Sequence, residues 1–286
     1  MTQQVGTIAA TIAALGTTLG PDVLARCRAL FDAEQTALAS RIAIAAQDCA
    51  YGPDPRHRLD LYGGKPGGRV PVLLFVHGGG FVQGDKGGAD IWVNAAVGRM
   101  AAEAGLVGAV LNYRLAPDHP WPAGGEDVLA AIDWLIADAA QHGGDPGRIV
   151  VMGTSAGAVH VSAALQLRPD LAVRGAVLLS GLYGYTPLDP RDGAYYGSAE
   201  HYPDRMPRKA LAETDLPLLL ACAQFDPPRF QAEFLGLMVE RLERHGTLPR
   251  SHIASGHNHY SMAMHLGTSD RRFANEVLDF VETVCG

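Results

Sequence analysis

Apolar runs of strand length alternate along most of the chain with longer stretches of helical periodicity. The strand-like runs fall at 70–76, 107–112, 148–153, 174–180, 216–222 and 250–254. The helical patterns fall near 88–104, 124–141, 156–167, 229–245 and 270–284. A helix that crosses over between two strands returns the chain to the same end of the sheet, so the strands pair in parallel. The alternation therefore predicts an α/β fold with a doubly wound, mostly parallel sheet and helices on both faces.

The length and composition fit a single globular domain. The chain has 286 residues, of which 48% are hydrophobic, and this is enough to bury a large core. Its formal net charge of −7 argues against nucleic acid and anionic membranes as partners, because both attract a basic face. No apolar run reaches transmembrane length, and residues 1–20 lack the basic start and cleavage site of a signal peptide.

The cysteines and histidines indicate neither a disulfide framework nor a metal site. Cys27, Cys49, Cys222 and Cys285 lie far apart, without the spacing of paired cysteines or of metal ligands. We interpret them as free thiols of a cytoplasmic protein, because thiols stay reduced in the cytosol. No pair of histidines has metal-ligand spacing, so we predict neither a metal nor another cofactor.

A glycine-flanked serine joins one predicted strand to the helix that follows it. The pentapeptide GTSAG, residues 153–157, stands between the apolar run 148–152 and the Ala-rich stretch 158–167. So sharp a turn strains the serine backbone, and the two glycines remove Cβ atoms that would collide where strand and helix pack. Ser155 is therefore the candidate nucleophile.

A glycine-rich turn, HGGG at residues 77–80, follows another predicted strand. The missing side chains leave backbone N–H groups free to approach a ligand. Acyl transfer builds negative charge on the substrate carbonyl oxygen, and each N–H donor of an oxyanion hole stabilises it by about 2.7–4 kcal/mol. We assign the N–H groups of Gly79, Gly80 and Ala156 to this hole and interpret His77 as a structural residue at the strand end.

A nucleophilic serine needs a histidine base and a carboxylate that orients the base. At a strand-to-helix turn of this kind the chain order is Ser, then Asp or Glu, then His. Asp226 follows the apolar run 216–222, and two histidines follow the short strand 250–254. Open α/β sheets gather their functional groups at such strand ends. A helix cap or an ordinary loop residue is the alternative interpretation of Asp226.

Two histidines compete for the role of base. His257 directly follows Gly256, whose conformational freedom would let the imidazole turn back over the strand ends. His259 is the alternative base, with His257 as its neighbour. We favour His257, so the predicted triad is Ser155, Asp226 and His257.

These motifs resemble those of the hormone-sensitive-lipase-like esterases, a group of α/β-hydrolases. HGGG stands at 77–80, GTSAG stands at 153–157, and Asn112–Ala123 is similar to the segment that those esterases carry between the two motifs. The resemblance covers residues 58–284 and implies an α/β-hydrolase fold with a small cap and carboxylesterase activity. The chain departs from the group near Asp226, where a second acidic residue is absent.

Other segments are similar to kynurenine-formamidase-type hydrolases. These segments are Gly80–Lys86, Ser180–Tyr183 and Phe225–Phe230. This second resemblance implies arylformamidase activity on the same triad as an alternative. It also favours His257 over His259, because the catalytic histidine of that group is followed two residues later by a carboxylate or polar residue.

Two segments are candidates for a cap over the site. In the esterase group the N-terminal segment covers the active site, and here residues 21–31 have helical spacing; a helix that only packs on the domain edge is the alternative. Residues 182–209 interrupt the alternation and contain clustered tyrosines, which can form a wall around an acyl group; an ordinary surface loop is the alternative. The predicted organisation is an N-terminal helical cap segment at 1–45 and a catalytic domain at 46–286, with a cap insertion near 182–209.

The candidate residues predict a serine hydrolase that cleaves short-chain carboxylic esters through an acyl-enzyme. Ser155 attacks, His257 carries the proton and Asp226 orients the imidazole. Arylformamidase activity is the alternative, and a binding protein on a hydrolase scaffold is a third hypothesis. The expected partner is a small-molecule ester substrate, with no nucleic acid and no membrane insertion, and a homodimer stays open.

Overall fold

Eight strands form a single sheet in a computed structural model that describes the backbone of residues 2–286 and the side chains of residues 6–286. The strands are β1 (Ile44–Ala50), β2 (Arg58–Tyr62), β3 (Val70–Val76), β4 (Val107–Leu111), β5 (Gly144–Thr154), β6 (Gly175–Leu179), β7 (Leu218–Phe225) and β8 (Arg250–Asn258). Their order across the sheet is β1-β2-β4-β3-β5-β6-β7-β8. β2 pairs antiparallel with β1 and with β4, and all later neighbours pair in parallel.

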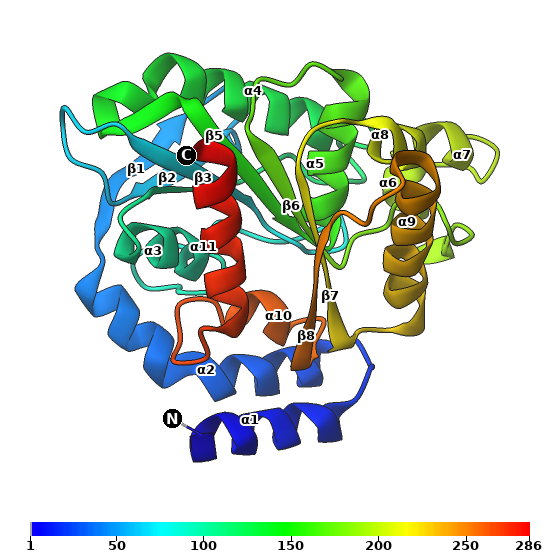
Figure 1. Cartoon of the computed structure of the whole chain (residues 1–286), viewed down its shortest axis with the longest axis horizontal. Helices are drawn as coiled ribbons and strands as arrows, with labels where there is room; N and C mark the ends of the chain where they lie inside the picture. Colours follow the sequence, from blue (N-terminus) through cyan, green and yellow to red (C-terminus); the bar gives the residue numbers. More distant parts are fainter. Residues whose placement is uncertain (1) are drawn as a thin grey trace.

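Helices cover both faces of the sheet and one end of it. The longer helices are α1 (Thr2–Leu15), α2 (Pro21–Arg41), α3 (Ala95–Glu103), α4 (Ala123–Asp138), α5 (Ala156–Leu167), α9 (Pro228–His245) and α11 (Arg272–Cys285). The short ones are η1 (Ala139–His142), η2 (Pro190–Asp192), α6 (Gly193–Tyr196), α7 (Tyr202–Arg205), α8 (Arg208–Glu213) and α10 (Ser261–Met264). In Figure 1, α1 and α2 lie together below the sheet, beside the end of β8. No helix among the described residues is both long and apolar enough to span a membrane.

Each face of the sheet has its own hydrophobic core. Successive residues of one strand point to opposite faces, so Leu74 and Val151 pack toward α4, α5 and α9, whereas Phe75 and Met152 pack toward α3 and α11. All four side chains are fully buried, and burial stabilises the fold by about 1.5–3 kcal/mol for each such side chain. Burial on both faces explains why the central parallel strands are continuous apolar runs.

The sheet confirms the predicted fold class and the six predicted strands, and α5 has the predicted bounds. β1 and β2 were not predicted, because charged residues such as Asp48 and Asp60 interrupt their apolar pattern. Asp60 is nevertheless fully buried, and the Lys86 ammonium lies 2.7 Å from its carboxylate. The helix expected near 88–104 begins only at Ala95. β8 continues to Asn258, four residues beyond its predicted end.

Candidate active site

The serine turn forms at the end of β5. Ser155 has a φ of 53°, which lies in the left-handed region and strains a residue with a side chain. A Cβ added to Gly157 would lie 2.1 Å from the Val76 carbonyl oxygen, and one added to Gly153 would lie 2.4 Å from the Gly157 carbonyl oxygen. Both glycines are therefore needed for the close packing of strand and helix, which presents Ser155 at the start of α5.

The glycine-rich turn lies against the serine. Gly79, Gly80, Ser155 and Ala156 line the same cavity. Gly79 has a φ of 139° and Gly80 a φ of 58°, and a Cβ on Gly79 would lie 1.9 Å from the Gln83 carbonyl oxygen. Ala156 is the first residue of α5, where backbone N–H groups lack helical partners and the helix dipole favours negative charge. The three residues predicted as N–H donors thus border the same cavity as the serine.

Asp226 is fully buried just after β7. One carboxylate oxygen accepts from His259 Nδ1 at 2.7 Å. The other accepts from the Ser180 hydroxyl at 2.6 Å and from the Ala223 N–H at 2.7 Å. Burial acts to raise the pKa of Asp226, but the hydrogen bond from His259 and the electrostatic attraction between that ring and the carboxylate, with the other donors, outweigh it and lower the pKa. The carboxylate is therefore an ionised acceptor.

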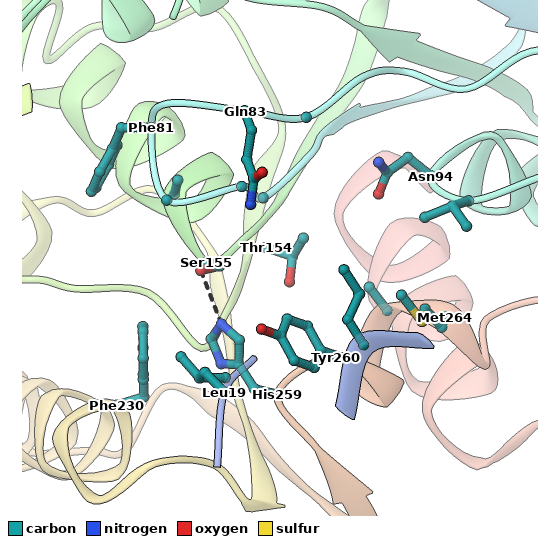
Figure 2. A pocket seen from close by; sticks show the side chains of 18 of the residues that line it. Leu19, Phe81, Gln83, Asn94, Thr154, Ser155, Phe230, His259, Tyr260 and Met264 are labelled. Atoms are coloured by element: carbon teal, nitrogen blue, oxygen red, sulfur yellow. Dashed lines mark hydrogen bonds between the residues drawn. The ribbon is translucent and has the colours of Figure 1, made fainter. Parts of the chain in front are cut away.

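His259 joins this carboxylate to the serine. Its Nε2 lies 3.0 Å from Ser155 Oγ, and its Nδ1 faces Asp226. Figure 2 shows the imidazole directly beneath the serine hydroxyl. The prediction that His257 occupies this position is wrong, because the structure brings Ser155 and Asp226 together with His259.

His257 lies in a second buried cluster. Its Nε2 is 3.3 Å from the Asp270 carboxylate, and its Nδ1 is 3.2 Å from Ser261 Oγ. The ring stacks on His265 with 3.8 Å between centroids. Burial, with the positive charge of His257, lowers the pKa of His265 to about 3. None of these contacts directs His257 toward Ser155.

The length of β8 explains the wrong choice of histidine. Asn258 still pairs with Phe225, after a register shift beyond Ala254, and Gly256 supports that irregularity with a φ of 82°. The first residue beyond the strand is therefore His259, which the strand-end rule requires for the base. Asn258 then closes the turn, because its N–H donates to Ser261 Oγ at 2.8 Å and its side-chain oxygen accepts from the Ser261 N–H at 3.0 Å.

The sequence analysis missed Ser180, which hydrogen-bonds the carboxylate of Asp226. Ser180 follows β6 directly, so the strand-end rule that selected Asp226 also applies to it. Its positive φ of 47° has no signature in a single sequence.

A cavity of about 800 Å³ lies over the serine and is open to solvent. Phe81, Leu182 and Phe230 form part of its wall near Ser155, and Met264 lies at the other end, toward α2. Figure 2 shows Phe81 and Phe230 on one side of the Ser155–His259 pair and Met264 on the other. A volume of this size can bury a small organic molecule.

The N-terminal segment forms one wall of this cavity. Thr17–Leu19, Leu24 and Arg28 line it together with the serine. The Gly20 N–H donates to the Tyr260 hydroxyl at 3.1 Å, which ties the start of α2 to the residue after His259. The segment therefore contributes lining residues to the cavity.

The insertion at 182–209 lines the cavity with residues other than its tyrosines. Leu182, Arg191 and Asp192 line the cavity, whereas none of the five tyrosines does so among the described residues. Tyr195 instead stacks on Phe81 with 4.3 Å between ring centroids and 3° between planes. The prediction of a tyrosine wall is wrong, because Tyr195, Tyr196 and Tyr202 pack against one another behind Phe81, and Tyr183 and Tyr185 pack in the core beside the sheet.

Glu233 on α9 anchors the start of this insertion. The fully buried carboxylate accepts hydrogen bonds from the four successive backbone N–H groups of Tyr183–Thr186, at 2.7, 2.8, 3.1 and 2.9 Å. A buried carboxylate without such donors would be strongly unfavourable. The contact fixes the chain where it leaves Leu182 at the cavity.

His77 has the structural role predicted for it. The ring is fully buried, its Nδ1 bonds the Gly78 carbonyl at 2.7 Å, and it stacks on Tyr113 with 4.4 Å between centroids. Burial lowers the pKa of His77 to about 4, so the ring is neutral near pH 7. It holds the glycine-rich turn and does not face the serine.

Comparison with known proteins identifies the fold family. A family profile described as "alpha/beta hydrolase fold" matches residues 73–214, the part of the chain that holds the glycine-rich turn and the serine. The chain belongs to the α/β-hydrolases. The sheet order and the strand-end positions of its serine, aspartate and histidine agree with this assignment.

This α/β-hydrolase is similar in sequence to bacterial esterases. It is 41% identical over 102 residues to the carboxylesterase NlhH of Mycobacterium tuberculosis, covering 36% of this chain and 31% of the relative. It is 43% identical over 115 residues to the esterase LipC of the same organism, covering 40% of this chain and 27% of the relative. The chain thus spans less than a third of the length of these two relatives.

Solved structures share the fold over nearly the whole chain. The structure of the esterase Est22 aligns with a TM-score of 0.70 at 19% identity, covering 93% of each chain. An esterase of Pyrobaculum calidifontis aligns with a TM-score of 0.67 at 22% identity, covering 92% of this chain and 94% of the other. These likenesses show the fold of the α/β-hydrolase, including the parts outside residues 73–214.

Proposed function

We propose that this α/β-hydrolase is a serine carboxylesterase that cleaves small esters with short acyl groups through an acyl-enzyme intermediate. The observation that carries the proposal is the continuous hydrogen-bonded chain from Ser155 Oγ through His259 to the buried Asp226 carboxylate. A serine in this arrangement can lose its proton to the imidazole as it attacks a carbonyl. The named activity of the esterases NlhH and LipC supports the same function.

The mechanism follows from the positions of these groups. Ser155 Oγ attacks the ester carbonyl carbon while His259 Nε2 takes its proton, and Asp226 holds the imidazole and stabilises its positive charge. The N–H groups of Gly79, Gly80 and Ala156 receive the charge that develops on the carbonyl oxygen. The intermediate then collapses, and His259 gives the proton to the departing alcohol. Water, deprotonated by the same imidazole, cleaves the acyl-enzyme and regenerates the serine.

Short acyl groups are proposed because of the walls of the cavity. Phe81, Leu182 and Phe230 close around the serine on one side, and a cavity of about 800 Å³ matches a small molecule better than a triglyceride. The N-terminal cap segment and the insertion at 182–209 are proposed to form the cap.

A nitrophenyl ester series tests the proposal directly. We expect a higher kcat/KM for a nitrophenyl butyrate than for a palmitate, and covalent labelling by a fluorophosphonate. Ser155→Ala should abolish the labelling and lower turnover by several orders of magnitude, on the order of 10⁶ where a triad acts as a unit. Near-normal turnover of folded Ser155→Ala would refute the mechanism, and a higher kcat/KM for N-formyl-kynurenine than for the butyrate would favour the arylformamidase alternative.

We also propose a homodimer. β8 is the last strand of the sheet and pairs with β7 among the described residues, and exposed Leu235, Val239, Leu242, Leu248 and Ile253 lie on it or on the α9 side next to it. Two copies of one edge can pair about a twofold axis, because antiparallel pairing of identical strands is self-complementary. Sedimentation of wild type and Ile253→Glu tests this, since the charge should shift the protein toward monomer.

A cytoplasmic location completes the proposal. The four cysteines are free thiols, which fits a reducing compartment. Fractionation of cells that produce the tagged protein tests this location.

A further inference from the structure

One hydroxyl beside the nucleophile faces the cavity. Thr154 is the last residue of β5, is only 7% exposed and lines the cavity. Among the described residues its hydroxyl makes no hydrogen bond. Water or a bound substrate in the cavity can therefore serve as its partner.

A second hydroxyl faces the same part of the cavity. Tyr260 follows His259 directly and is half-buried. Its oxygen accepts from the Gly20 N–H at 3.1 Å, so its own proton is free to be donated. Figure 2 shows the oxygens of Thr154 and Tyr260 close to Ser155, on the side that leads toward Met264.

Among the described residues, the opposite side of the serine is lined by apolar and ion-paired side chains. Phe81 and Phe230 lie there in Figure 2, and Leu182 joins them in the lining. The charged residues at that side pair with each other, since Arg229 bonds the Asp192 carboxylate at 2.5 Å. Among the labelled residues, the hydroxyls of Thr154 and Tyr260 thus lie on one side of the reacting centre, and the aromatic rings of Phe81 and Phe230 lie on the other.

We infer that Thr154 and Tyr260 form a hydrogen-bonding subsite that selects esters with a hydroxyl group near the scissile carbonyl. The inference rests on the proposed esterase function and names its substrate class. A substrate hydroxyl can accept from Tyr260 and exchange a hydrogen bond with Thr154, which an alkyl group of the same shape cannot do. A site built to hydrogen-bond a hydroxyl rejects the analogue without it, because its own polar groups are then left unpaired. The substrate hydroxyl comes from either the acyl group or the alcohol.

Two pairs of substrates with matched shapes separate these sources. The acyl pair is methyl 3-hydroxybutyrate, as each enantiomer, against methyl 3-methylbutyrate. The alcohol pair is 2-hydroxyethyl butyrate against propyl butyrate. We expect wild type to prefer the hydroxylated member of one pair in kcat/KM by about tenfold, since each neutral hydrogen bond contributes roughly three- to tenfold.

Three variants assign that preference to the two hydroxyls. Thr154→Val keeps the shape but removes the hydroxyl, and it should lower the preference ratio about three- to tenfold. Thr154→Ser is the matched control, because it keeps the hydroxyl and should keep the ratio. Tyr260→Phe should lower the ratio by a similar factor. Circular dichroism checks that each variant is folded, and the ratio within one variant cancels any loss of active enzyme.

The outcomes distinguish the subsite from the esterase function. If no member of either pair is hydrolysed, the proposed esterase function fails. Hydrolysis with equal kcat/KM within both pairs overturns the subsite alone. A preference that both Thr154→Val and Tyr260→Phe leave unchanged also overturns it. A preference that these two variants lose and Thr154→Ser keeps supports the subsite, and the substrate pair that shows it tells whether the hydroxyl comes from the acyl group or the alcohol.

Discussion

Two imidazole–carboxylate pairs lie near the end of β8, and they differ in what their second nitrogen faces. The outer pair joins His259 to Asp226 at 2.7 Å, and the inner pair joins His257 to Asp270 at 3.3 Å. Both imidazoles are buried, at 8% and 4% exposed. The second nitrogen of His259 faces Ser155 at the cavity, whereas that of His257 faces Ser261 within the protein. A buried His–Asp pair is therefore no indication of a base unless a nucleophile lies within reach.

The inner pair has a different use. Ser261 bonds His257 and also receives the N–H of Asn258, so the inner pair braces the turn that carries His259. Asp270 is held in turn by Arg272, whose guanidinium lies 2.5 Å from the carboxylate. We infer that the inner pair positions the base without contact with substrate.

The largest expected effect is the difference in kcat between variants of the two histidines. His259→Gln should lower kcat about as much as loss of the serine, because a triad acts as a unit. His257→Gln should cost no more than about tenfold, since glutamine can still bond Asp270 or Ser261. Steady-state kinetics with a butyrate ester on both folded variants measures the difference. A larger loss in His257→Gln would reverse the assignment made from the structure.

The carboxylates give the next largest difference. Asp226→Asn should lower kcat by about 10⁴, because the amide no longer holds the imidazole in its working tautomer. Asp270→Asn, the same change in the inner pair, should lower kcat less than about tenfold. Burst and steady-state kinetics would show whether acylation is the step affected in Asp226→Asn. Equal losses in the two variants would mean that the inner pair takes part in the chemistry.

Ser180→Ala tests whether the Ser180 hydroxyl positions Asp226 in the outer pair. It removes one of three hydrogen bonds to Asp226, and we expect kcat to fall about three- to tenfold. Ser162→Ala is the matched control, because the buried Ser162 hydroxyl bonds only the Ala158 carbonyl within α5. Similar kcat values for the two variants would show that Ser180 does not position Asp226.

The local motifs of this site could be predicted from sequence, and its long-range contacts could not. The serine turn and the glycine-rich turn depend on Gly153, Gly157 and Gly79, whose close contacts are set within short stretches of chain or between adjacent strands. The choice between His257 and His259 depends on where β8 ends, and the register shift at its end follows from pairing with β7. No periodicity in residues 250–258 reports that shift.

The inner pair could not be predicted from sequence either, because it also depends on contacts between separate segments. Asp270 lies in a loop, and only folding brings it to His257 and His265. The antiparallel strands β1 and β2 were missed because Asp60 breaks the apolar pattern, and its partner Lys86 lies 26 residues away. Sequence reasoning thus succeeds where strand-end geometry is local and fails where a partner is distant.

The smallest expected effect concerns stability and the inner pair. Burial acts to raise the pKa of Asp270, but hydrogen bonds from Arg272 and His257 outweigh it and hold the pKa well below its usual range. A carboxyl whose pKa is depressed in the folded state stabilises the protein above its unfolded pKa, near 3.9, and this contribution is lost as the pH falls toward the folded value. Asp270→Asn should therefore lower the free energy of unfolding by about 1–3 kcal/mol at pH 6, and the difference from wild type should shrink below about pH 4. Urea unfolding at pH 6 and pH 3 measures it, with the exposed Asp170→Asn as control. A difference that stays the same at both pH values would show that the charge of Asp270 does not stabilise the fold, and the inner pair would then act through shape alone.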